Sequence, residues 1–195
     1  MSARWQLAQA NVARMRAPLE DPRMEGFRSL LTRINALADA SPGFVWRLQT
    51  EAGDATAVRA FDDPLLLFNM SVWESLEPLH RYVYRSDHVQ PLRARRAWFL
   101  PLDGPSLVRA RAVPSEDASG AAARSEPKVS EGHLVLWWIP AGQLPGVADA
   151  RAKLERLAEQ GPTPEAFTFR APFPAPGAPR SEFPEVDAEF CGGVP

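Results

Sequence analysis

The sequence predicts an α+β fold of the ferredoxin-like kind, in which an antiparallel sheet carries helices on one face. Segments with a two-residue apolar repeat and segments with a 3.6-residue repeat follow one another in the order β-α-β-β-α-β. The chain has 195 residues, enough for one domain with a sizeable core. Its 45% hydrophobic and 24% charged residues are ordinary for a globular protein.

The first part of the chain supplies a strand, a helix and two further short segments. Residues 5–15 alternate as a half-buried strand does. Asp21 and Pro22 are typical of an N-cap and a first-turn proline, and a helical apolar repeat follows them as far as the sequence SPG. Residues 44–49 predict a strand rich in aromatic and β-branched side chains, and 55–61 are the candidate for its returning hairpin strand.

The middle of the chain predicts a strand and a helix. Residues 65–73, LLLFNMSVW, give the clearest strand pattern, and a helix follows from about Leu76. Pro91 lacks the backbone N–H that a helix needs, so we expect the helix to end between Asp87 and Gln90. His88 would then lie at a turn and would not continue a helical stripe.

The last part predicts a strand, a helix and one more short strand. Residues 133–142 are typical of a buried strand, 146–161 of a helix that ends at Gly161, and 166–170 are the candidate for the last strand. We therefore expect a single domain over residues 1–170. Two proline-rich segments, 101–132 and 171–195, have no regular repeat of apolar residues. We expect the first to be a flexible insertion and the second to be an extended tail.

Composition excludes several classes of protein. The formal net charge of −2 gives no reason to expect binding to nucleic acid or to an anionic membrane. No apolar run is long enough to span a bilayer, and the first residues lack a hydrophobic signal core, so a cytoplasmic protein is expected. Cys191 is the single cysteine, and three separate histidines do not have the spacing of a metal site, so no metal ligands are predicted.

Polar residues share one face of the predicted sheet. Alternation puts Asn69, Ser71 and Trp73 on one side of their strand, and Gln9 with Asn11 on one side of the first strand. Arg47 alternates in the same way on the second strand. An unpaired buried polar group costs about 1–3 kcal/mol, so such a face is too polar for a dry core. A ligand cavity, a network of mutually bonded side chains and a hydrated dimer interface remain open.

Several segments together carry a resemblance. ASPGFVWRLQ, FDDPLLLFNMSVWESLEPLHRYVYRSDH, RRAWF, HLVLWWIPAG and GPTPEAFTF resemble an uncharacterised bacterial family of unknown function, over roughly residues 5–170. That family belongs to the dimeric α+β barrel superfamily, with antibiotic-biosynthesis and haem-degrading monooxygenases as distant relatives. The resemblance implies a dimeric α+β barrel and a homodimer. The chain departs from the family by its insertion at 101–132 and by Pro91.

The resemblance also implies candidate site residues. Haem-degrading relatives use an asparagine on the first strand, a tryptophan and a helical histidine, and the matching residues here are Asn11, Trp73 and His88, with His80 as the alternative histidine. His88 is the candidate for a base or for a ligand of haem iron, while a site without any cofactor stays equally open. The candidate substrate-binding residues are Arg47, Asn69, Ser71, Tyr84 and Trp138.

Two functions follow as expectations. The first is an oxidative, monooxygenase-like enzyme acting on a small apolar or aromatic molecule held between the sheet and the helices. The alternative is a non-catalytic protein that binds a small molecule or haem or serves in assembly.

Overall fold

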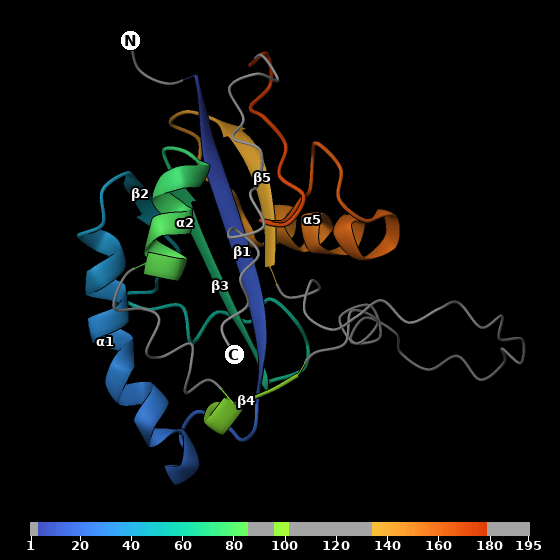
Figure 1. The fold of residues 1–195 in the computed structure, drawn as a ribbon. Coiled ribbons are helices and arrows are strands. Elements are labelled where there is room, and N and C mark those ends of the chain that lie inside the picture. The colour runs from blue at the N-terminus through green and yellow to red at the C-terminus, as the bar shows by residue number, and fades with distance from the viewer. Residues whose placement is uncertain (1–3, 86–95, 102–133, 179–195) are drawn as a thin grey trace, which may run out of the picture.

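The computed structural model describes residues 4–85, 96–101 and 134–178. It contains a five-stranded sheet in the order β2-β3-β1-β4, with β5 also paired to β1 (Figure 1). The strands are β1 (Trp5–Met15), β2 (Phe44–Arg47), β3 (Leu66–Trp73), β4 (Phe99–Leu100) and β5 (Leu134–Pro140). The helices are the 3-10 turn η1 (Pro22–Met24), α1 (Glu25–Asp39), α2 (Leu76–Arg85) and α5 (Val147–Gln160).

Every strand pair in the sheet is antiparallel, and β1 lies in its centre. β1 pairs with β3 on one side and with β5 and the short β4 on the other, while β2 pairs with β3. This is the order that the β-α-β-β-α-β pattern predicts, so the prediction of an α+β fold on an antiparallel sheet is confirmed. The predicted N-cap is also present, because the Asp21 side chain accepts from the backbone N–H of Arg23.

The prediction that helices cover only one face of the sheet is wrong. Leu79 of α2 packs with Leu7 and Trp73 on one face. α5 packs on the opposite face, where its buried side chains join the even-numbered apolar residues of β1 (Figure 1). Those α5 side chains are Ala150, Leu154 and Leu157. The physical reason is the apolar stripe of α5, which the apolar even-numbered face of β1 can bury.

The position of α5 bears on the predicted homodimer. A sheet with helices on one face only would leave its other face for a partner to cover, and this would favour the homodimer that the family resemblance implies. Within the described residues that face is already covered, by α5 and by Val58, Ala60 and Phe61 of the loop before β3. The homodimer stays a prediction, and the packing of the described chain supplies no independent reason for it.

Residues 55–61 do not form the predicted hairpin strand. The Asp54 carboxylate accepts from the backbone N–H and the hydroxyl of Thr56, and the N–H of Val58 donates to the carbonyl of Ala55. These local bonds fold the backbone into turns instead of leaving it free for a sheet ladder. Ala60 is buried all the same, and Val58 and Phe61 are partly buried against the core, so the segment covers the sheet as a loop.

The segment after α5 is held against the edge of β5. Residues 166–170 make isolated bridges instead of the predicted regular strand, with two backbone hydrogen bonds between Leu136 and Phe167. Phe173 packs in the same apolar cluster as Phe167. Packing against this cluster therefore extends at least to Phe173, and the domain limits stay a prediction. The predicted helix end at 87–90, His88 and all but the first residue of the insertion at 101–132 lie outside the described residues.

Candidate functional site

The polar face predicted from alternation is assembled by the register of β1 and β3. Antiparallel pairing puts residues of the two strands opposite one another, and each pair forms a row across the sheet. The rows on the face beneath α2 are Leu7 with Trp73, Gln9 with Ser71, Asn11 with Asn69, and Ala13 with Leu67. Side chains from residues about sixty positions apart in the sequence therefore meet in one polar strip.

Three hydrogen bonds run along this strip, and we call the connected residues the relay. The indole Nε1 of Trp73 donates to Ser71 Oγ at 2.9 Å, and Ser71 Oγ donates to Gln9 Oε1 at 2.9 Å. Gln9 Nε2 then donates to Asn11 Oδ1 at 2.9 Å. Trp73, Ser71 and Gln9 are all buried, so the relay satisfies groups that would otherwise be unpaired in the core.

Asn11 and Asn69, which we call the amide row, lie where the relay ends. Asn69 is exposed although β3 is an inner strand, and Asn11 is half-buried. The described residues give the Asn69 side chain no hydrogen-bond partner. Among residues 4–85, 96–101 and 134–178, none therefore buries Asn69 at this row.

Apolar clusters border the amide row at both ends. Toward Trp73 lies a cluster that includes Leu7, Leu79 and Phe167, which we call the Trp73 cluster. Toward the other end of β1 lies the Phe27 cluster, made of Met15, Ala17, Met24 and Phe27 with Leu31, Leu67, Trp98 and Phe99 packed against it. The amide row is therefore an accessible polar position between two apolar clusters whose central residues are buried.

Trp73 has no exposed surface and is held by two aromatic neighbours. Its ring stacks on Tyr82 at a centroid distance of 5.1 Å and meets Phe44 edge-on at 5.3 Å. Tyr82 Oη lies 3.4 Å from the carbonyl oxygen of Ile34 in α1. Burial raises the pKa of the Tyr82 phenol, and the carboxylate of Asp39 adds to this shift. Trp73, predicted as a catalytic residue, therefore reaches the amide row only through the relay.

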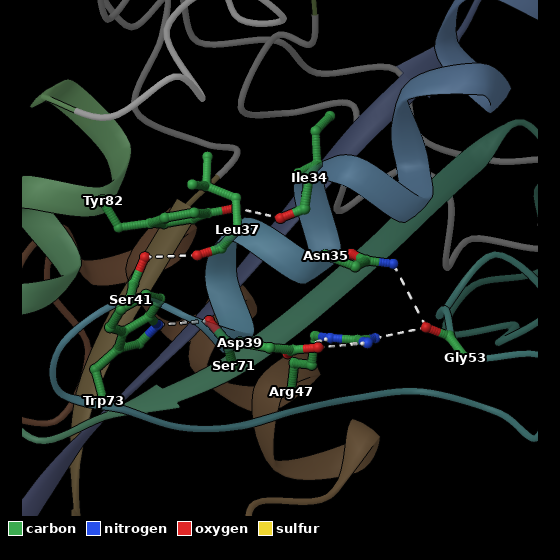
Figure 2. A network of polar contacts seen from close by, with 10 residues as sticks. All are labelled: Ile34, Asn35, Leu37, Asp39, Ser41, Arg47, Gly53, Ser71, Trp73 and Tyr82. Carbon is green, nitrogen blue, oxygen red and sulfur yellow. Dashed lines mark hydrogen bonds and ion pairs between the residues drawn. The ribbon is translucent and has the colours of Figure 1, made fainter.

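Arg47 joins α1, β2 and the turn after β2 (Figure 2). Its guanidinium makes two bonds to the carboxylate of Asp39, at 2.8 and 3.1 Å, and its Nη1 donates to the carbonyl of Gly53 at 2.7 Å. The side chain is 13% exposed. Arg47 was predicted to bind substrate, and the structure engages all three of its nitrogens within the fold.

Replacing Arg47 with methionine should lower the free energy of unfolding by about 1–3 kcal/mol, because Gly53 and Asp39 would lose hydrogen bonds in a largely buried place. Arg81→Met is the matched control. Arg81 pairs with Glu77 on the exposed surface of α2, where such pairs contribute about 0.3–0.5 kcal/mol. Urea denaturation of both variants measures the difference, and equal losses would show that the Arg47 contacts do not hold the fold.

Two further candidates, His80 and Tyr84, lie on α2 in an aromatic cluster. The rings of His80 and Tyr84 are 4.6 Å apart, and Phe169 meets them edge-on at 5.8 and 5.5 Å. His80 is buried, whereas Tyr84 is 40% exposed. Through these ring contacts, α2 packs against the segment after α5. The preferred histidine, His88, lies outside the described residues, so its role stays a prediction.

Trp138 lies on β5 and holds the last part of the described chain. Its indole Nε1 donates to the carbonyl of Phe173 at 2.8 Å, and its ring faces Phe167 at 6.5 Å. This contact depends on a segment 35 residues further along the chain. Its predicted role as a substrate-binding wall stays a prediction.

Sequence patterns did not identify Phe44, Asp39 or Phe173 as partners of the candidate residues. Each sits on an element of its own, and only tertiary packing brings it to Trp73, Arg47 or Trp138. Among residues 4–85, 96–101 and 134–178, no group of three or more His, Cys, Asp or Glu side chains could hold a metal ion. Within the same ranges, no helix has the length and apolar character needed to cross a membrane.

Comparison with known proteins gives one family. The model of a family described as a domain of unknown function, DUF3291, matches residues 6–111 and 124–183. These two ranges cover most of the chain, and they confirm the resemblance to an uncharacterised family. No curated protein sequence matches the chain.

Two solved structures show a limited likeness. One is SnoaB, a cofactor-independent oxygenase from Streptomyces nogalater, with 21% identity over 49% of this chain and 84% of that one, at a TM-score of 0.34. The other is a variant of SnoaB with one asparagine replaced by alanine, with 20% identity over 50% of this chain and 86% of that one, also at 0.34.

Proposed function

The chain belongs to the DUF3291 family, and we propose that it binds a small, largely apolar or aromatic molecule at the amide row and oxidises it as a monooxygenase-like enzyme. The proposed site lies on the sheet face beneath α2, between the Trp73 cluster and the Phe27 cluster.

One observation carries the binding proposal. Asn69 is exposed in the middle of an inner strand, while its neighbours Phe68 and Met70 are 1% and 0% exposed on the other face. Sites for small molecules are mostly apolar with a few placed polar groups. The amide row, with apolar clusters on both sides, supplies that combination.

The oxidative part of the proposal has a different support. It rests on the resemblance of the strand and helix segments to a superfamily that includes monooxygenases, and fold likeness alone does not fix chemistry. Both a haem-dependent reaction and a cofactor-free reaction are compatible with this proposal. A cofactor-free reaction on 1-naphthol would place one atom of O2 on the ring and release the other as water, leaving a naphthoquinone.

Binding is tested with 1-naphthol as the probe, in calorimetric titrations of the native chain, Asn69→Leu and Gln143→Leu. Asn69→Leu should weaken binding roughly fivefold or more, because the hydroxyl of the probe loses its amide partner. Gln143→Leu places the same side chain on the exposed turn after β5, at the end of the sheet opposite Asn11, and should bind as the native chain does. Equal binding by all three proteins would overturn the proposed site.

Oxidation is tested in the same samples with an oxygen electrode and an absorption spectrum. We expect the native chain to consume O2 and form naphthoquinone, either without any cofactor or after addition of haem. Binding that depends on Asn69 without O2 uptake under either condition would overturn the oxidative part and leave a binding protein.

That second candidate, a binding protein without catalysis, is favoured by one specific observation. The side chains best suited to chemistry are held in structural contacts, since Trp73 is buried at the start of the relay and Arg47 is paired with Asp39. The oxygen measurement above separates the two candidates.

A further inference from the structure

We infer that Trp73, through Ser71 and Gln9, fixes the amide of Asn11 so that it presents its N–H to the ligand. The site would therefore select a molecule with an acceptor oxygen, such as a ketone carbonyl, over one with only a donor. This inference rests on the proposed function for the place where the ligand binds. Trp73 acts here as a positioning residue.

The direction of the relay is set at Trp73. An indole N–H can donate a hydrogen bond and cannot accept one. Its bond to Ser71 Oγ, 2.9 Å long, therefore has one possible direction. Because Trp73 has no exposed surface, water cannot replace Ser71 as the partner of this donor.

The hydroxyl of Ser71 determines which end of the Gln9 amide faces it. The hydroxyl accepts from Trp73, and its own hydrogen has one remaining partner among the described residues, the Oε1 of Gln9 at 2.9 Å. Ser71 and Gln9 are 8% and 7% exposed. The Gln9 carbonyl must therefore face Ser71, which turns the Gln9 amide nitrogen toward Asn11.

At the end of the relay, the amide of Asn11 has a defined orientation, with its oxygen toward Gln9. Gln9 Nε2 donates to Asn11 Oδ1 at 2.9 Å, so one of the two lone pairs of that amide oxygen is already engaged. The described residues give the Asn11 Nδ2 no acceptor, and the residue is half-buried beside exposed Asn69. The group that Asn11 offers to a ligand is therefore a donor.

Asn69 does not share this constraint. Its amide has no hydrogen-bond partner among the described residues, so it can turn either its oxygen or its nitrogen to a ligand. Selectivity must then come from Asn11. A ligand with only a donor would have to reverse buried hydrogen bonds of the relay or leave the Asn11 N–H unpaired, and both cost binding free energy.

Three probes of similar size and different polarity test the inference. 1-Indanone carries an acceptor oxygen and no donor, indole carries an N–H donor, and indene carries neither. We expect the native chain to bind 1-indanone roughly fivefold or more tightly than indole or indene, measured by ligand-observed NMR titration.

Variants of the relay should change this preference even though their residues do not touch the ligand. Trp73→Phe and Ser71→Ala each remove the donor or the link that sets the direction. Gln9 and Asn11 can then adopt either amide orientation, and we expect the affinities for 1-indanone and indole to come within about twofold. Asn11→Asp leaves only acceptors and should reverse the preference in favour of indole.

Tyr82→Phe is the matched control. It removes the hydroxyl from the half-buried ring that stacks on Trp73 and leaves every bond of the relay in place. It should therefore keep the native preference even where it lowers stability. A change in preference in Tyr82→Phe as large as in Trp73→Phe would overturn the inference, since packing alone would then explain the effect.

The inference and the proposed function can fail separately. If Asn69→Leu weakens binding of all three probes but Ser71→Ala keeps the native preference for 1-indanone, the site stands and the relay does not set its polarity. If neither variant changes the binding of any probe, the ligand binds elsewhere and both are wrong.

Discussion

Replacing Trp73 with alanine should lower the free energy of unfolding by about 3–5 kcal/mol. The side chain has no exposed surface, so its whole contact area with Phe44 and Tyr82 would be lost. The substitution also leaves a cavity beneath α2 and removes the donor that begins the relay. A loss of this size is a large part of the 5–15 kcal/mol that typically stabilises a domain.

Trp46→Ala is the control for this substitution. Trp46 lies on the second strand and is only half-buried against the opposite face of the sheet, so we expect roughly half the loss. Urea denaturation followed by circular dichroism compares the two variants with the native chain. If Trp73→Ala cost no more than Trp46→Ala, Trp73 would not be the centre of its cluster.

Gly43→Ala should lower the free energy of unfolding by about 2–3 kcal/mol, through two separate effects. The backbone φ of Gly43 is +76°, a left-handed conformation that costs other residues about 1–2 kcal/mol. An added Cβ would also lie 2.6 Å from Cγ and 2.7 Å from Cβ of Pro78 on α2. Close approach of the turn before β2 to α2 therefore requires glycine here.

Gly142→Ala separates the two effects. Gly142 has a φ of +84°, but an added Cβ would have nothing within 4 Å. The backbone cost should be the same, so the loss for Gly142→Ala should be about 1–2 kcal/mol, and any further loss at Gly43 would measure the contact with Pro78. Equal melting temperatures for the two variants would show that α2 can move away from Gly43 without loss.

Local patterns were sufficient for the strands and helices whose repeats are long. β1, β3 and α1 appear where period-two and period-3.6 repeats predict them, and the same alternation correctly puts Gln9 and Ser71 on one face. Side-chain direction along a strand depends only on the backbone, so it can be read without knowledge of the partner strand. The polar face of the candidate site was therefore predictable.

The relay within that face was not predictable. Whether Ser71 meets Gln9 or Asn11 depends on the register of β1 against β3, and a change in register would pair different side chains. The same limit applies to Arg47, whose pairing with Asp39 depends on how α1 ends beside β2. These contacts decide between a structural and a functional role, and sequence alone leaves that choice open.

Packing partners explain two of the differences between the predicted and the observed fold. The Val, Ala and Phe residues of 55–61 favour a strand by composition, but turn bonds of Asp54 and Thr56 shape the segment and its apolar side chains still reach the core. The apolar stripe of α5 shows that one side of this helix must be buried. The stripe does not show which face of the sheet will bury that side. Tertiary contacts decided both outcomes.

The central claim, that a small molecule binds at the amide row, is tested most directly by NMR of the asparagine side chains. The chain has three asparagines, Asn11, Asn35 and Asn69, so selective 15N labelling gives three pairs of side-chain N–H signals. Asn35 lies on α1 with its Nδ2 toward the carbonyl of Gly53 and serves as the internal control. Titration with 1-indanone should shift the signals of Asn11 and Asn69 and leave those of Asn35 in place. Binding that leaves the signals of Asn11 and Asn69 unmoved would contradict the account.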